Sequence, residues 1–181
     1  MKLIETKIKD LYILDPRVFG DDRGYFFESF NSQTFQELIG EEVEFVQDNQ
    51  SMSGENIVRG LHFQNPLFAQ GKLVRVIKGE VIDVAVDIRK DSPTYGEHVS
   101  VRLSGENNRM FWIPPGFAHG FSSLEEGTIF SYKCTNYYSK ESEGSVAWDD
   151  PELNINWGVE NPIISEKDQE SPLFRDLKSK F

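Results

Sequence analysis

Residues 72–89 read KLVRVIKGEVIDVAVDIR, and this stretch decides the fold class. In residues 82–88 (IDVAVDI), isoleucine or valine stands at every second position. A period of two is typical of a half-buried antiparallel strand. We therefore expect a hairpin of two strands that turns at residues 78–80, where Lys-Gly-Glu interrupts the apolar pattern.

Other short stretches of the chain have the same character. They are rich in apolar or β-branched residues, and Gly, Pro, Asn and Ser separate them. The further candidate strands are residues 23–30, 45–52, 57–63, 97–103, 109–113, 118–123 and 128–138. Many short strands with such boundaries favour a sandwich or a barrel, so we expect an all-β fold.

Short helices are expected only toward the two ends of the chain. Residues 31–40 (NSQTFQELIG) predict a helix, because Asn31 or Ser32 can cap its start and Gly40 suits its end. Over the last thirty residues, prolines recur and the hydrophobic periodicity is weak. We expect this terminal segment to wrap the strands and to end in short helical turns.

Length and composition indicate one globular domain, residues 1–181. Cys134 is the only cysteine, so no internal disulfide can form, and no basic-then-apolar segment resembles a signal peptide. We therefore expect a cytoplasmic protein. Uninterrupted apolar runs fall far short of the roughly 20 residues that cross a bilayer, so no membrane insertion is expected.

The net charge of −11 bears on the class of partner. Binding to a nucleic-acid backbone depends on Lys and Arg that neutralise phosphates, so we expect no nucleic-acid partner. A local cluster of Arg and Lys could still bind a small anion, because exposed charges more than about 8 Å apart are largely screened at physiological salt.

Residues 57–66 (IVRGLHFQNP) place one of only three histidines, His62, inside a short apolar run. Such a histidine can be a core residue satisfied by hydrogen bonds, or it can accept a proton in catalysis. In a regular strand, Arg59 and His62 would face opposite sides, but Gly60 between them could mark a β-bulge. A bulge would let both side chains face one cavity.

Two further candidates are ambiguous on their own. Lys72 shares a strand face with Val74 and Val76, and it could equally be a solvated lysine at a strand edge. Tyr132 shares an aromatic-rich face with Phe130, where such residues more often belong to the core than to a site. Neither signal is specific without further support.

The segment IPPGFAHGF (113–121) raises the question of a metal. It is similar to the Pro-x-Gly-x-x-His element of cupin barrels, with His119 as the ligand. A companion His-x-His element should supply further ligands, but the chain has only Leu-His-Phe around His62, and His98 falls on a different candidate strand. We therefore expect no metal site and no cofactor.

Taken together, these residues resemble the dTDP-4-dehydrorhamnose 3,5-epimerase family of cupin-type sugar epimerases. The blocks that carry the resemblance are DDRGYFFESFN (21–31), FVQDNQSMS (45–53), VRGLHFQ (58–64), QGKLVRVIKGEVIDVAVDIRKDSPTYG (70–96), WIPPGFAHGF (112–121), YKCTNYYSKESEG (132–144), WDDP (148–151), INW (155–157) and SEKDQ (165–169). So many blocks in order over nearly the whole chain make a chance match improbable.

The resemblance implies a metal-free, cupin-like jelly-roll barrel with short peripheral helices, a homodimer, and an isomerase of dTDP-L-rhamnose biosynthesis. The implied substrate is dTDP-4-dehydro-6-deoxy-D-glucose, a dTDP-linked 4-keto-6-deoxy sugar that is inverted at C3 and C5. The family pattern makes His62 the base and Tyr132 the acid on the opposite face of the sugar. Asp168 is then the partner of the base, and Lys72 the partner of the enolate oxygen.

By the same resemblance, a larger set of residues would contact the nucleotide or the sugar. They are Arg23, Phe26, Glu28, Gln47, Asn49, Arg59, His119, Tyr138, Glu143 and Lys167. Without the resemblance, Arg23, Glu28 and Gln47 would be interpreted as exposed strand or loop residues. In the family the partner subunit completes part of the nucleotide pocket, which implies that the N-terminal block reaches across the dimer.

The implied chemistry explains why these residue types are needed. A ketone at C4 acidifies the hydrogens on C3 and C5, so a base can remove one and leave an enolate. Histidine, with an unperturbed pKa of about 6.5, suits that step, and tyrosine, near about 10, can supply a proton to the other face. Asp168 also fits a second pattern, helix capping in Ser165-x-x-Asp168, and the two interpretations are compatible.

Three alternatives remain open. An epimerase that acts at C3 or C5 alone would use the same base and acid. A metal-dependent cupin oxygenase or isomerase would use His62 and His119 as ligands. A non-catalytic sugar-binding cupin would not need His62, Asp168 and Tyr132 together. Because all three stand at the family positions, the 3,5-epimerase is our hypothesis.

Overall fold

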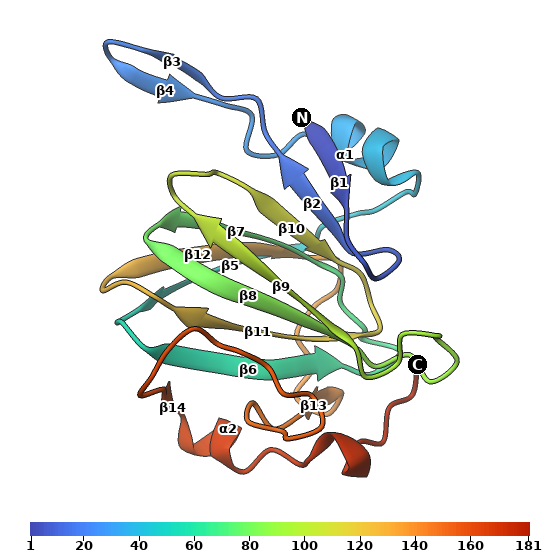
Figure 1. The fold of residues 1–181 in the computed structure, drawn as a ribbon. Helices are drawn as coiled ribbons and strands as arrows, with labels where there is room; N and C mark the ends of the chain where they lie inside the picture. The colour runs from blue at the N-terminus through green and yellow to red at the C-terminus, as the bar shows by residue number, and fades with distance from the viewer.

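Two mainly antiparallel β-sheets lie face to face in the computed structural model, which describes residues 1–181 (Figure 1). The first sheet contains, in spatial order, β1 (Lys2–Glu5), β2 (Tyr12–Asp15), β10 (Met110–Ile113), β7 (Lys72–Lys78), β12 (Thr128–Cys134) and β5 (Gln47–Ser53). The second contains β13 (Glu143–Ser145), β6 (Ile57–Gln64), β11 (Phe117–Ser123), β8 (Glu80–Asp87) and β9 (His98–Ser104), with β14 (Ile163–Ile164) parallel to β6. The predicted all-β class is confirmed.

Apolar side chains from both sheets fill the space between them. The largest buried cluster has 14 residues, among them Val74 and Phe130 of the first sheet and Val81, Ala85 and Phe121 of the second. Removing these side chains from water is the main force that holds the sheets together.

The predicted hairpin at residues 78–80 is wrong, although both of its strands exist. Strand β7 belongs to the first sheet and β8 to the second, so the chain crosses from one sheet to the other at Gly79. Gly79 has φ +82°, and a side chain there would collide with Thr128. The crossing places Lys72, at the start of β7, on the wall opposite β8.

Strand β8 is buried on both faces, whereas its alternating pattern predicted a half-buried strand. Val81 and Ala85 face the interior between the sheets, and Val84 and Val86 lie in a second cluster on the outer side. That outer cluster is completed by residues of the C-terminal segment, including Trp157. The wrapping predicted for the terminal segment is confirmed, and it removes the solvent-exposed face of the strand.

The helices occur where the sequence predicted them. In α1 (Ser32–Ile39), the side chain of Asn31 accepts a hydrogen bond from Thr34 N at 3.0 Å, and Gly40 ends the helix with φ +73°. The terminal segment carries two short helical turns, α2 (Glu166–Gln169) and the 3₁₀ turn η1 (Phe174–Asp176). No helix is both long and apolar enough to span a membrane.

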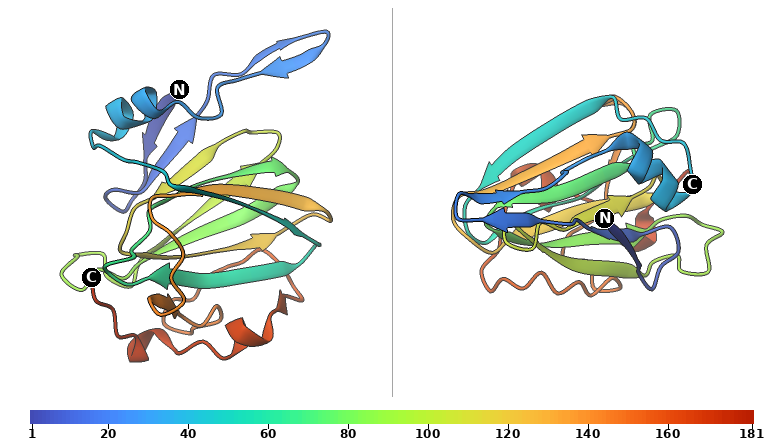
Figure 2. Two further views of the ribbon diagram at one scale, coloured as in Figure 1. Left: turned by 180° about the vertical axis from the view of Figure 1, so that it is seen from behind. Right: turned by 90° about the horizontal axis from the view of Figure 1, so that it is seen from above.

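A two-stranded arm of β3 (Phe19–Asp21) and β4 (Gly24–Phe26) projects away from both sheets (Figures 1 and 2). The strand predicted at 23–30 is therefore much shorter. The strand predicted at 128–138 likewise ends at Cys134. The arm leaves Phe19, Tyr25 and Phe26 at 51%, 61% and 70% exposure, which is unusual for large apolar side chains in a monomer.

The β-bulge predicted at Gly60 is confirmed. His62 pairs with His119 and Arg59 pairs with Phe121, so three steps along β6 match two along β11. Gly60 has φ +122°, and a Cβ atom there would lie 2.6 Å from Gly120 Cα. Only glycine fits, because both the backbone conformation and the close approach of β11 exclude a side chain.

Replacing Gly60 by alanine should therefore lower the free energy of unfolding by about 1–3 kcal/mol more than replacing Gly127, since the overpacking adds to the backbone strain. Gly127 is the matched control because its φ is also positive, at +69°, but it has open space where a Cβ would stand. Urea unfolding of both variants measures the difference. Equal losses would contradict the packing argument.

Candidate active site

Two adjoining cavities of about 590 and 360 Å³ form a cleft between the sheets. They share Asn49, His62, Lys72 and Tyr132, and their sizes are typical of pockets for small ligands. The predicted site residues that line the cleft are Gln47, Asn49, Arg59, His62, Lys72, His119, Tyr132, Tyr138, Glu143, Lys167 and Asp168. The structure thus brings together all predicted site residues except three, and it places Arg59 and His62 in one cavity as the bulge predicted.

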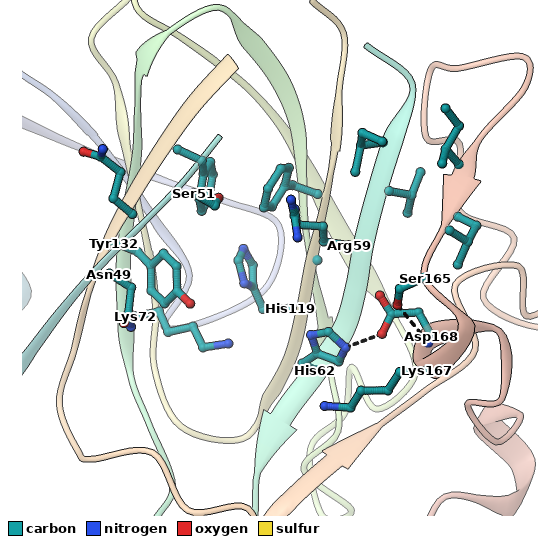
Figure 3. Close-up of a pocket in the computed structure, with 18 residues that line it drawn as sticks. Asn49, Ser51, Arg59, His62, Lys72, His119, Tyr132, Ser165, Lys167 and Asp168 are labelled. Atoms are coloured by element: carbon teal, nitrogen blue, oxygen red, sulfur yellow. Dashed lines mark hydrogen bonds and ion pairs between the residues drawn. The ribbon is translucent and has the colours of Figure 1, made fainter. Parts of the chain in front are cut away.

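His62 and Asp168 form a hydrogen-bonded pair at the edge of this cleft (Figure 3). His62 Nε2 lies 2.6 Å from Asp168 Oδ1, while Asp168 Oδ2 accepts a hydrogen bond from Gly60 N at 3.3 Å. The capping interpretation also holds, because Ser165 Oγ accepts a hydrogen bond from Asp168 N at 3.2 Å. Capping and histidine pairing coexist, because the backbone N–H of Asp168 binds the cap and its side chain binds His62.

The surroundings of Asp168 favour its ionised form. Burial alone would raise the pKa of this carboxyl. The hydrogen bond from His62, the charge that His62 carries when protonated, and the hydrogen bonds from Gly60 and Ser165 lower the pKa overall. A carboxylate at Nε2 accepts the ring N–H, which leaves the Nδ1 lone pair of a neutral His62 free. Figure 3 shows Nδ1 pointing away from Asp168 into the cleft, where it can accept a proton.

Tyr132 faces the same space from the opposite sheet. It lies on β12, whereas His62 lies on β6, and the two side chains flank the first cavity (Figure 3). Both also line the second cavity. Burial raises the pKa of the Tyr132 phenol, with the Cys134 thiol adding to the shift and Arg59 opposing it. The phenol therefore keeps its proton at neutral pH and can act as a donor. Its ring also packs against the main core, so the core interpretation is partly correct.

Lys72 directs its amino group into the space between Tyr132 and His62 (Figure 3). Lys133 and Lys167 are the only lysines that form an ion pair, so the Lys72 ammonium has no carboxylate partner. Burial lowers the pKa of Lys72, and the nearby charges of Asp83 and Glu143 partly oppose that shift. A cation held in a cleft without a partner is suited to an anionic ligand.

Asp83 holds His119 at the inner wall of the cleft, a role that was not predicted from the sequence. Both carboxylate oxygens of Asp83 lie 3.0 Å from His119 Nε2, and Asp83 is completely buried. Burial lowers the pKa of His119, and the Asp83 charge opposes this. The sequence does place a carboxylate in the centre of an apolar strand, but the alternating pattern predicted that this position is exposed.

The two histidines of the cupin comparison each bind a different carboxylate. His62 Nε2 is bonded to Asp168 and His119 Nε2 to Asp83. No group of three or more His, Cys, Asp and Glu side chains is arranged to hold a metal ion. The third histidine, His98, lies on β9 and does not line the cleft.

Ion pairs and hydrogen bonds order the mouth of the cleft. The Tyr138 hydroxyl donates to Glu143 Oε2 at 3.1 Å, and Lys167 Nζ donates to Glu143 Oε1 at 2.6 Å. Burial raises the pKa of Glu143, but these two bonds outweigh it and lower the pKa overall. Arg59 Nε donates to Ser53 Oγ at 3.1 Å and Nη2 donates to Met52 O at 3.3 Å, which leaves part of its exposed guanidinium available to a ligand.

Arg23, Phe26 and Glu28 do not line the cleft of their own chain. Arg23 and Phe26 lie on the projecting arm, where the Arg23 guanidinium pairs with Asp21 and is 90% exposed. Glu28 follows the arm and accepts a hydrogen bond from Asn31 at 3.1 Å.

Replacing Asp168 by asparagine should lower the free energy of unfolding by about 1.5–3 kcal/mol at pH 7, the range for hydrogen bonds to charged groups. Because the pKa of Asp168 is depressed in the folded state, its stabilisation is complete above the ordinary carboxyl value of 3.8 and is lost as the pH falls through the folded pKa. Urea unfolding should thus show the full loss at pH 7 and a smaller one at pH 3, which lies below the ordinary carboxyl value.

The matched control for this experiment is Asp176→Asn, because Asp176 is an exposed carboxylate in the same terminal segment. It should leave stability unchanged at both pH values. A loss for Asp168→Asn that is the same at pH 3 and pH 7 would contradict an ionised Asp168.

Comparisons with known proteins agree with this geometry. The family model described as dTDP-4-dehydrorhamnose 3,5-epimerase matches residues 5–176. The chain is 59% identical over 174 residues to the dTDP-4-dehydrorhamnose 3,5-epimerase of Salmonella typhimurium, covering 96% of this chain and 95% of that protein. It is 54% identical over 176 residues to the protein of the same name from Shigella flexneri, covering 97% of each.

Solved structures show the same fold. A dTDP-6-deoxy-D-glucose-3,5-epimerase from Legionella pneumophila, crystallised with dTDP-4-keto-L-rhamnose, aligns with a TM-score of 0.94 at 50% identity, covering 97% of this chain and 94% of that one. A 3'-monoepimerase from Streptomyces bikiniensis, crystallised with dTDP-quinovose, aligns with a TM-score of 0.88 at 29% identity, covering 93% and 85%. The two facing sheets are therefore a cupin-like jelly roll, as predicted, and the chain belongs to the dTDP-4-dehydrorhamnose 3,5-epimerase family.

Proposed function

We propose that this protein is an isomerase that converts dTDP-4-dehydro-6-deoxy-D-glucose by inverting C3 and C5, a step of dTDP-L-rhamnose biosynthesis. Membership of the family and the names of the relatives support this function. The observation that carries it is that His62 and Tyr132, from opposite sheets, line the same cleft. Epimerisation needs a base on one face of the sugar and an acid on the other, and this arrangement provides both.

In the first step, His62 Nδ1 removes the proton from C3 or C5. The electrons of the broken C–H bond form a carbon–carbon double bond to C4, and the C4 carbonyl oxygen becomes an enolate oxygen. Asp168 keeps the ring oriented and stabilises the imidazolium that forms, without taking the proton itself. The retained proton on Nε2 is what leaves Nδ1 free to act as the base.

Lys72 is placed to stabilise the enolate oxygen. Its ammonium points into the space between the base and the acid and has no competing ion pair. Two unit charges about 4 Å apart attract by roughly 4 kcal/mol at an effective dielectric of about 20. Because each 1.4 kcal/mol changes a rate about tenfold, this interaction would lower the barrier substantially.

In the second step, Tyr132 donates its phenolic proton to the same carbon from the opposite face. The carbon–carbon double bond returns to a single bond, the C4 carbonyl forms again, and the configuration at that carbon is inverted. Solvent then restores the proton of Tyr132 and removes the one held by His62. Repeating the cycle at the second carbon completes the reaction.

The remaining polar residues of the cleft would bind the nucleotide sugar. Arg59 has guanidinium donors for a diphosphate, since only part of the group is used by Ser53 and Met52. His119, which Asp83 holds in place, would contact a sugar oxygen. Gln47, Asn49, Tyr138, Glu143 and Lys167 line the rest of the cleft and are the further proposed substrate contacts.

The arm leads to a proposal about assembly. Arg23 and Phe26 match family positions for nucleotide contacts, yet they lie on an exposed apolar arm outside their own cleft. We infer a homodimer in which the arm of each subunit, with Glu28 beside it, completes the nucleotide end of the partner's cleft. Burial of Phe19, Tyr25 and Phe26 in such an interface would explain their exposure in the single chain.

The proposed chemistry is tested with the nucleotide sugar in heavy water, followed by NMR at C3 and C5. The wild type should incorporate deuterium at both carbons with inversion. His62→Asn should reduce incorporation by about 10²- to 10⁴-fold at both, the usual share of general base catalysis. Tyr132→Phe should still exchange through His62 but with retained configuration, because the donor on the other face is lost.

The control for these variants is His98→Asn, since His98 lies on β9 away from the cleft. It should exchange like the wild type. Full activity in His62→Asn would overturn the role of His62. Deuterium at one carbon only would instead support a single-site epimerase. The chain also resembles a 3'-monoepimerase, so this outcome would be compatible with its fold.

The proposed dimer predicts that two defective variants complement each other. Arg23→Ala removes an arm contact and His62→Asn removes the base, so each homodimer should be weakly active. After mixed refolding, heterodimers would contain one cleft with both residues intact, and activity should exceed that of either variant. Light scattering should show two subunits per particle. Activity equal to the mean of the two variants, or a monomer in solution, would contradict the proposal.

A further inference from the structure

Gln64 is a buried amide at the end of β6, two residues beyond His62, and only 5% of it is exposed. Its side chain makes three hydrogen bonds, all to backbone atoms of two loops. Nε2 donates to Phe68 O at 2.6 Å and to Tyr137 O at 3.1 Å, and Oε1 accepts from Ser139 N at 2.7 Å. Both amide hydrogens are therefore used, so Gln64 has no donor left for a ligand.

Two of these bonds lie on either side of Tyr138. The carbonyl of Tyr137 and the amide of Ser139 flank it directly, and both bind to Gln64. The Tyr138 N–H itself donates to Gln47 Oε1 at 3.2 Å. Two side-chain amides thus hold the backbone at and around this one residue.

Packing does not explain how Tyr138 is kept in place. Strand β12 ends at Cys134, so the loop has no sheet ladder at this point, and Tyr138 is 57% exposed. The two loops are also joined by Gln70, which donates to Asn136 O at 2.7 Å, and by Asn136, which donates to Leu67 O at 3.2 Å. Side-chain amides replace the missing backbone pairing. Among them, only Gln64 binds the backbone of the residues on both sides of Tyr138.

We propose that Gln64 is a positioning residue for substrate binding: its buried amide holds Tyr138 over the second cavity of the cleft. This inference rests on the proposed function, in which Tyr138 contacts the nucleotide sugar. Gln64 itself borders the second cavity, but both of its amide hydrogens bind backbone carbonyls, so it acts through Tyr138 and not as a donor to the ligand. It therefore affects the binding of substrate and leaves the proton transfers of His62 and Tyr132 unchanged.

A double-mutant cycle tests this inference, with Gln64→Leu, Tyr138→Leu and the double variant. Gln64→Leu should raise KM about tenfold, with kcat within about twofold of the wild type, because only binding depends on the position of Tyr138. In the Tyr138→Leu background the same change should have no further effect on KM. If Gln64→Leu does not fold, Gln64→Glu keeps the shape but cannot donate to the two carbonyls as a carboxylate, and it should raise KM in the same way.

The matched control is Asn107→Leu, because Asn107 also makes three hydrogen bonds to backbone, with Ser104, Arg109 and Arg102, but in a turn that does not line the cleft. It should lower stability without changing KM. An unchanged KM in Gln64→Leu, a fall in kcat instead, KM effects that add in the double variant, or no effect of Tyr138→Leu would each overturn the inference. Absence of epimerisation by the wild type would instead refute the proposed function.

Discussion

The hydrogen bond between His62 and Asp168 ties the terminal segment to the second sheet and orients the candidate base. It joins β6 to a short helix 106 residues later in the chain, so the terminal segment must wrap the second sheet before the pair can form. The same wrapping buries the outer face of β8. It also surrounds Asp168 with donors that keep it ionised. Completion of the fold and assembly of the candidate base are therefore coupled.

Features that depend on local signals could be predicted from the sequence. Period-two patterns and turn residues located most strands of both sheets, and Asn31 and Gly40 marked the ends of α1. Gly60 predicted the bulge that brings Arg59 and His62 to one cavity, because glycine in a strand often marks such an irregularity. Asp168 and Tyr132 could be joined to His62 only through the family resemblance, since no spacing in the sequence relates residues so far apart.

Features that depend on long-range contacts could not be predicted. Residues 72–78 and 80–87 have the pattern of a hairpin, and only the global topology sends the chain to the other sheet at Gly79. The two opening strands, β1 and β2, had no clear alternation and were missed. Asp83 fitted an exposed position until His119 was found against it. Gln64 had no signal at all, because its partners lie on loops that the fold brings to it.

The proposed mechanism requires that Asp168 hold His62 as the tautomer whose Nδ1 lone pair faces the cleft. Nitrogen-15 NMR of histidine-labelled protein at neutral pH measures this directly, with His62→Asn used to assign the signals. In the neutral form of the ring we expect the proton on Nε2 and an unprotonated Nδ1, and we expect that preference to weaken in Asp168→Ala. A proton on Nδ1 of the neutral ring would place the lone pair against Asp168 and would contradict the proposed mechanism.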